Sequence, residues 1–156
     1  MSNRILVPYD GSEYSNKAVR QTIEYAKSLS KDAEIILMYV VPEIHLPPSY
    51  DYGMRISYVK STKEYLKELY QQMKMRALEM LNRKKAEFKD AAINNVTTRV
   101  SIGNPAEQIL DLASAEKVDL IVIGSLGLSG ISKLKALGST SRSVSERAKC
   151  PVLIVH

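Results

Sequence analysis

Short segments made almost wholly of apolar residues recur along the chain and alternate with longer segments of helical spacing. Three of these runs are Arg4–Tyr9, Glu34–Val41 and Val118–Ile123, and each is only as long as a strand. Continuous apolar runs of this length are typical of strands that are buried on both faces, as in parallel sheets. Parallel strands need crossover helices, so the alternation predicts right-handed βαβ units.

The remaining segments complete this pattern. Helices are expected at residues 13–30, 60–92 and Ser139–Lys149, and strands at Val96–Ile102 and Pro151–Val155. A further helix should begin after Asn104, because Asn104 is a good cap, Pro105 suits the first helical position, and Glu107 completes a capping box. Residues 42–59, rich in Pro and Tyr, are predicted to be a loop, either a lid or contact surface or a plain surface excursion.

The length of 156 residues suits one domain, so residues 1–156 should form a single unit. The predicted fold class is α/β, with one open, doubly wound, parallel sheet of five strands and helices on both faces. No run approaches the roughly 20 apolar residues that a membrane-spanning helix needs. Met1–Tyr9 does not resemble a signal peptide, so the chain is predicted to be cytoplasmic. The single cysteine, Cys150, excludes an intramolecular disulfide.

The net charge of +5 is concentrated in one segment. Residues 60–89 contain nine basic and four acidic residues, and the rest of the chain is balanced. A basic helix face can attract nucleic acid or acidic partners, although a solvated face is the commoner explanation. We therefore predict no specific nucleic-acid reader. Any binding there should be weak and should fall steeply with salt, because only phosphate charge would be neutralised.

In open α/β sheets, ligands bind beyond the carboxyl ends of the strands, at the point where the strand order reverses. Three segments should lie at such ends: Asp10-Gly11-Ser12, Val40-Val41 and the glycine-rich Gly124–Gly138. The helix that opens at Ser139 would offer free backbone N–H groups to a phosphate. The chain contains no P-loop, no dinucleotide fingerprint and no plausible Ser–His–acid triad.

Four pieces of the sequence resemble the universal stress protein family, in its ATP-binding form. They are Ile5–Ser12, Gly103–Ile109, Asp119–Ser125 and Cys150–Val155, and their order and spacing together are specific. The resemblance covers essentially the whole chain. It implies a strand order of 3-2-1-4-5 and a single nucleotide-binding domain.

The resemblance also implies roles for particular residues. Asp10 would hold the ribose or adenine end of ATP, and Val40 would meet adenine through its backbone. The glycines would line the phosphate path, while Ser139 and Thr140 would bond phosphate oxygens. The complete binding set implied in this way is Pro8, Asp10, Val40, Gly124, Ser125, Gly127, Gly138, Ser139 and Thr140.

ATP-binding members carry Gly-x2-Gly-x9-Gly-Ser/Thr, whereas ten residues, 128–137, separate Gly127 from Gly138 here. We expect a local bulge between Gly130 and Gly138 to absorb the extra residue. The implied function is a regulatory or protective stress-response module that binds ATP, with Mg²⁺, and hydrolyses it slowly or not at all, because no base is evident. The alternative is a family member that binds no nucleotide and acts through contacts with an unknown protein client.

The apolar strand at the end of the chain predicts a homodimer. In the family's strand order, Val152–Val155 lies at the sheet edge, and an uncovered apolar edge invites aggregation. Pairing two such edges about a two-fold axis would cover both. Replacing Ile154 with Lys is expected to weaken the dimer.

Overall fold

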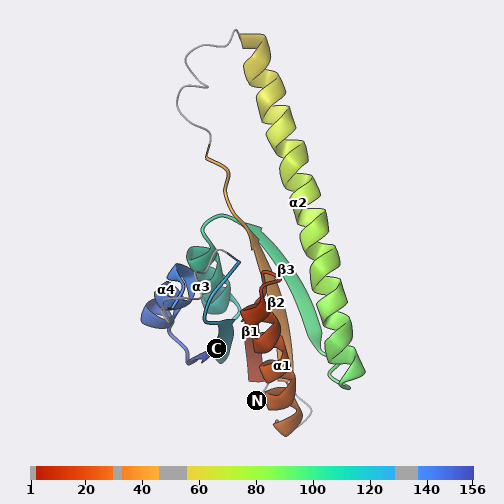
Figure 1. Cartoon of the computed structure of the whole chain (residues 1–156), viewed down its shortest axis with the longest axis vertical. Helices are drawn as coiled ribbons and strands as arrows, with labels where there is room; N and C mark the ends of the chain where they lie inside the picture. Colours follow the sequence, from red (N-terminus) through yellow and green to blue (C-terminus); the bar gives the residue numbers. More distant parts are fainter. Residues whose placement is uncertain (1–2, 30–32, 46–55, 129–136) are drawn as a thin grey trace.

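A computed structural model describes residues 3–29, 33–45, 56–128 and 137–156, with the side chains of α2 described from Lys63 onward. Strands and helices alternate throughout (Figure 1). In chain order the elements are β1 (Asn3–Pro8), α1 (Glu13–Ser28), β2 (Ala33–Val41), α2 (Ile56–Asp90), β3 (Val96–Ile102), α3 (Pro105–Ala115), β4 (Leu120–Gly124), α4 (Ser139–Arg147) and β5 (Val152–Val155).

The five strands form one sheet in the order β3-β2-β1-β4-β5, and every neighbouring pair is parallel. This confirms both the predicted fold class and the implied order 3-2-1-4-5. The chain builds the sheet from β1 outward to β2 and β3, then returns to the other side of β1 for β4 and β5. The strand order therefore reverses between β1 and β4, which is where ligands bind in sheets of this kind.

Helices cover both faces of the sheet, as alternate residues of the strands require. On one face Ile5 and Val7 of β1 pack with buried residues of α1 and α2, such as Val19 and Phe88. On the other face Leu6 and its neighbours in β2 and β4 pack with α3 and α4. Among the described residues, no helix combines the length and the apolarity needed to cross a membrane.

The helix α2 differs from its predicted extent. It begins at Ile56 rather than at residue 60, so the end of the segment predicted as loop 42–59 is helical. Tyr58 and Val59 are weak helix formers, which hid this first turn. Residues 46–55 lie outside the described residues. The amino-terminal part of α2 projects past the carboxyl ends of the strands (Figure 1). There the hydroxyl oxygen of Tyr70 accepts a hydrogen bond of 2.6 Å from the backbone N–H of Ile44.

The ends of α3 and α4 refine two further predictions. Asn104 caps α3 as expected, because its side chain accepts from the N–H of Glu107 at 3.1 Å. The carboxylate of Glu107 bonds Arg147 of α4, and so joins two helices rather than the two ends of one turn. The helix α4 ends at Arg147, two residues earlier than predicted, and Ala148 is already extended. Pro151 disfavours a helical conformation at Cys150, which favours this early end.

Candidate functional site

The turn after β1 holds Asp10 in a fixed position. Gly11 has a φ of +83°, a left-handed conformation that suits glycine. Ser12 then caps α1 by accepting from Ser15 N at 3.1 Å. The first carboxylate oxygen of Asp10, Oδ1, accepts from the N–H of Ser12 at 2.9 Å. Asp10 is half-buried, and the hydrogen bond to Ser12 N restricts rotation of its carboxylate. The direction of the second oxygen is therefore fixed by the turn.

That second oxygen meets the segment after β4. The Oδ2 atom of Asp10 accepts from the N–H of Leu128 at 3.3 Å. A Cβ atom at Gly127 would lie only 2.9 Å from the same oxygen. The structure therefore brings Asp10 and Gly127 together across the point where the strand order reverses.

Gly124 has a different reason to be glycine. A Cβ atom there would lie 2.7 Å from the backbone carbon of Tyr14 and 2.9 Å from Ser15 N, both in α1. The absence of a side chain at Gly124 allows β4 to pack directly against the first turn of α1. These contacts with α1 are packing contacts, and the role of Gly124 in lining a phosphate path stays a prediction.

The start of α4 is fixed against the end of β4. Ser125 is buried, and its carbonyl oxygen accepts from Gly138 N and from the hydroxyl of Ser141, both at 2.8 Å. Gly138 occupies the cap position, and no side chain there bonds the free N–H groups of the helix. Ser139 is exposed and Thr140 half-buried at this uncapped end. The predicted bulge between Gly130 and Gly138 falls in residues 129–136, outside the described residues.

Sequence reasoning overlooked Ser141. Its hydroxyl donates to Ser125 O and lies 3.0 Å from Gly138 O, and the residue is buried. It anchors the beginning of α4 to the end of β4. The sequence did contain one sign that Ser141 is buried. It lies three residues before Val144, on the same inner face of the helix.

The two other predicted residues lie at the carboxyl ends of β1 and β2. The register pairs Pro8, the last residue of β1, with Met38, and Tyr9 N donates to Met38 O at 2.7 Å, so Val40 lies two residues beyond that level on β2. Val40 is half-buried and packs on the side of the sheet that carries α3 and α4. The carboxyl ends of β1, β2 and β4 thus contribute to one region, to which Gly138 adds the start of α4.

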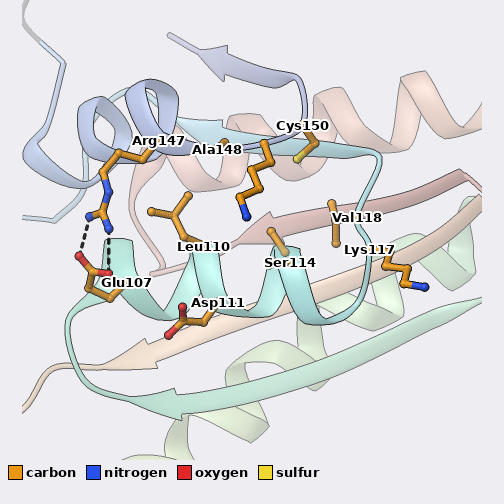
Figure 2. Close-up of a pocket in the computed structure, with 11 residues that line it drawn as sticks. Glu107, Leu110, Asp111, Ser114, Lys117, Val118, Arg147, Ala148 and Cys150 are labelled. Atoms are coloured by element: carbon orange, nitrogen blue, oxygen red, sulfur yellow. Dashed lines mark hydrogen bonds and ion pairs between the residues drawn. The ribbon is translucent and has the colours of Figure 1, made fainter.

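Within the described residues no three His, Cys, Asp or Glu side chains gather as a metal site would require. A separate hollow of about 400 Å³ lies between α3 and the connection from α4 to β5 (Figure 2). It contains none of the predicted site residues. At its rim Arg147 bonds Glu107 through two contacts of 2.5 and 3.0 Å, and this pairing lowers the pKa of Glu107. Burial raises the pKa of Cys150 on the same surface, so its thiol is held neutral and is a weak nucleophile.

Compared with known proteins, residues 1–156 match the model of the universal stress protein family. The universal stress protein YxiE of Bacillus subtilis is 35% identical over 156 residues and covers 100% of both chains. The solved structure of MJ0577 from Methanocaldococcus jannaschii is 28% identical, with a TM-score of 0.81 over 99% of this chain and 96% of that one. The structure of UspA from Lactobacillus plantarum is 25% identical, with a TM-score of 0.80 over 100% and 99%.

Proposed function

The chain belongs to the universal stress protein family, and from that premise we propose that it binds ATP, with Mg²⁺, at the carboxyl ends of β1, β2 and β4. In this proposal it is a regulatory or protective module of the stress response that acts in the cytoplasm as a homodimer. It hydrolyses ATP slowly or not at all.

The observation that carries the proposal is the meeting of Asp10 with Gly127 and Leu128. A carboxylate accepts hydrogen bonds from ribose hydroxyls, and the N–H of Leu128 that it now holds is the kind of donor that suits a phosphate oxygen. Because position 127 carries no side chain, a ligand can approach the backbone beside Asp10. The chemistry of Asp10, Gly127 and Leu128 therefore suits a nucleotide.

The start of α4 supplies the second part of the site. Its first N–H groups carry the positive end of the helix dipole, and no side chain caps them. The hydroxyls of Ser139 and Thr140 lie on the same turn and can donate to phosphate oxygens. Asp10 at one end and this turn at the other would hold the two ends of a nucleoside phosphate, with the backbone near Val40 facing the base.

Mg²⁺ would be bound mainly through the phosphates of ATP, since magnesium retains most of its water ligands and needs few protein carboxylates. It would neutralise phosphate charge. Asp10 is already engaged by two backbone N–H groups, so it serves to position the ligand rather than to abstract a proton from water.

Two more distant structures of this fold support the choice of an adenine nucleotide. One is a universal stress protein in complex with cAMP, at 24% identity and a TM-score of 0.63. The other is a family member from Arabidopsis thaliana with AMP bound, at 18% identity and a TM-score of 0.66. At these identities they support the argument only through the shared fold, which can hold adenine nucleotides.

The direct test is to denature freshly purified protein, identify any released adenine nucleotide by chromatography, and titrate the emptied protein with ATP and Mg²⁺ by calorimetry. We expect binding that is lost in Asp10→Asn and kept in Asp111→Asn, which makes the same charge change on the exposed surface of α3. Absence of released nucleotide together with absence of heat at millimolar ATP would refute the proposal.

The ten-residue spacer, residues 128–137, favours a second function of another class. If the extra residue displaces the phosphate subsite, the protein binds no nucleotide and acts through protein contacts alone. The homodimer and an unidentified client would then be its only partners. Calorimetry distinguishes the two functions, because only the first predicts heat on addition of ATP.

A further inference from the structure

A row of lysines runs along α2 and includes none of the residues of the proposed nucleotide site. Its members, which we call the lysine stripe, are exposed and recur at intervals of four, seven, eleven and four residues: Lys63, Lys67, Lys74, Lys85 and Lys89. At about 100° of rotation per residue, they fall within roughly 80° of the helix circumference. The stripe therefore runs nearly parallel to the helix axis.

The stripe lies on one flank of α2, beside its buried side. On the opposite flank of α2, Lys84 lies 5.4 Å from the ring centre of Tyr9, and Met80 approaches Gly11. These contacts turn that flank toward β1. The buried Leu81 and Phe88 point into the core between the two flanks. The stripe thus lies on the side of β3, which is an edge strand of the sheet.

The lysines of the stripe are not neutralised by α2 itself. Among the described side chains of α2, the one ion pair joins Lys84 to Glu87, and neither belongs to the stripe. The acidic residues Glu64, Glu68 and Glu79 lie further round, on the outer surface of the helix. Five positive charges are therefore presented along one flank of the helix.

The spacing of these charges matches a periodic polyanion. At 1.5 Å per residue, Lys63 and Lys85 are separated by about 33 Å along the axis, and so are Lys67 and Lys89. One turn of duplex DNA is about 34 Å long, so a helix that lies along the duplex meets the same strand again after that distance. Lys74 lies about 16 Å from both Lys63 and Lys85, at the middle of the first of these intervals.

We propose that the lysine stripe of α2 is a docking surface for the phosphate backbone of a double-stranded nucleic acid, bound without regard to sequence. The stripe contains no aromatic side chain on which the bases of a single strand could stack. It contains no arginine to read a base edge in two bonds. The surface offers charge along one flank and no group that reads a base, and it does not depend on the nucleotide site.

Fluorescence anisotropy with a labelled 20-base-pair duplex tests the proposal. If five lysines each neutralise a phosphate, affinity should fall roughly 500-fold between 50 and 200 mM salt. In the double variant Lys85→Gln, Lys89→Gln, the fall should shrink to roughly 40-fold, since three contacts remain. Glutamine keeps a helix propensity close to that of lysine, so the fold is preserved.

The matched control is Arg76→Gln with Arg83→Gln, which removes the same charge from exposed positions off the stripe. It should leave both the affinity and the salt dependence close to those of the unmodified protein. Equal losses in the two double variants would mean that net charge alone governs binding, and would overturn the proposal. So would tighter binding of a single strand of the same length, equal binding of polyglutamate, or no binding at 50 mM salt.

Discussion

A single methyl group at position 127 probes the arrangement around Asp10. In Gly127→Ala, the new Cβ would lie 2.9 Å from Oδ2 of Asp10, closer than such contacts are found in proteins. The φ of Gly127 is outside the left-handed region, so the backbone itself accepts alanine. The carboxylate must therefore move, while the main chain can stay in place.

The free-energy cost of Gly127→Ala follows from the hydrogen bonds that the Asp10 carboxylate makes. Asp10 accepts from Ser12 N at 2.9 Å and from Leu128 N at 3.3 Å, and rotation of the carboxylate away from residue 127 sacrifices at least one of these contacts. A hydrogen bond to a charged group contributes about 1.5–3 kcal/mol. If Asp10 positions the nucleotide, its displacement should weaken ATP binding roughly 10- to 100-fold. A valine, with two more carbon atoms, should abolish binding.

Calorimetric titration with ATP and Mg²⁺ measures the loss, and thermal unfolding followed by circular dichroism measures stability. Gly124→Ala is the contrasting variant, because its Cβ would collide with the backbone of α1 and with the Cβ of Tyr14 rather than with the end of a side chain. We expect Gly124→Ala to lower the melting temperature markedly. Gly127→Ala should lower the melting temperature less than Gly124→Ala does, because only a carboxylate has to move.

A double-mutant cycle isolates the contact. Because binding is already lost without Asp10, the cycle is measured by thermal unfolding. In an Asp10→Ala background the oxygen that residue 127 would strike is absent, so adding Gly127→Ala should cost little further stability. Gly127→Ala that binds ATP as well as the unmodified protein would refute this reasoning. Losses that simply add in the double variant would also do so, since they would show that the two positions act separately.

Three further predictions concern other parts of the chain. Ser139→Ala should weaken ATP binding by about 1 kcal/mol, one hydrogen bond, whereas Ser145→Ala on the same helix should leave the titration unchanged. Leu153→Lys should convert the proposed homodimer to a monomer, as measured by analytical ultracentrifugation at micromolar concentration. Leu153 is 38% exposed at the sheet edge, so the substitution should spare the fold. Ile154 packs on the core, so Ile154→Lys would perturb the fold as well as the dimer. A monomer in the unmodified protein would contradict the edge pairing. Cys150 should react with Ellman's reagent more slowly in the folded than in the guanidine-unfolded protein at pH 8, because burial raises the pKa of its thiol. For the same reason, the contribution of Cys150 to stability is present at neutral pH and is lost as pH rises through the range in which the thiol ionises. Cys150→Ser should therefore reduce the loss of stability at alkaline pH.

The pattern of apolar runs was sufficient to predict the sheet. Ile5–Val7 and Ile35–Met38 are buried on both faces of the sheet, as continuous apolar runs predict. Burial on both faces is what the predicted βαβ units require. The start of α2 could not be predicted in the same way, because Ser57, Tyr58 and Val59 have no strong preference for a helix. The position where a long exposed helix begins depends on the cumulative preference of many residues, not on one capping residue.

The candidate site was predicted in its parts but not in its contacts. Glycines at 124 and 127 look equivalent in the sequence, yet one faces the backbone of α1 and the other faces Asp10. The difference depends on which element packs against each position, and no local pattern contains that information. The anchoring of α4 by Ser141 was missed for the same reason, since its acceptor, Ser125 O, is 16 residues away.

Asp10 and Leu128 are 118 residues apart in the chain, and their bond joins the first strand to the segment that follows the fourth. During synthesis β1 emerges first, but its second neighbour in the sheet, β4, is made only after β2, α2, β3 and α3. Closing so long a loop is slow compared with forming local contacts. A ligand that needs both sides of this contact binds only a chain that has completed its central strand pairing. ATP at a concentration 100 times its dissociation constant would then add about 2.7 kcal/mol to the finished fold and nothing to its precursors.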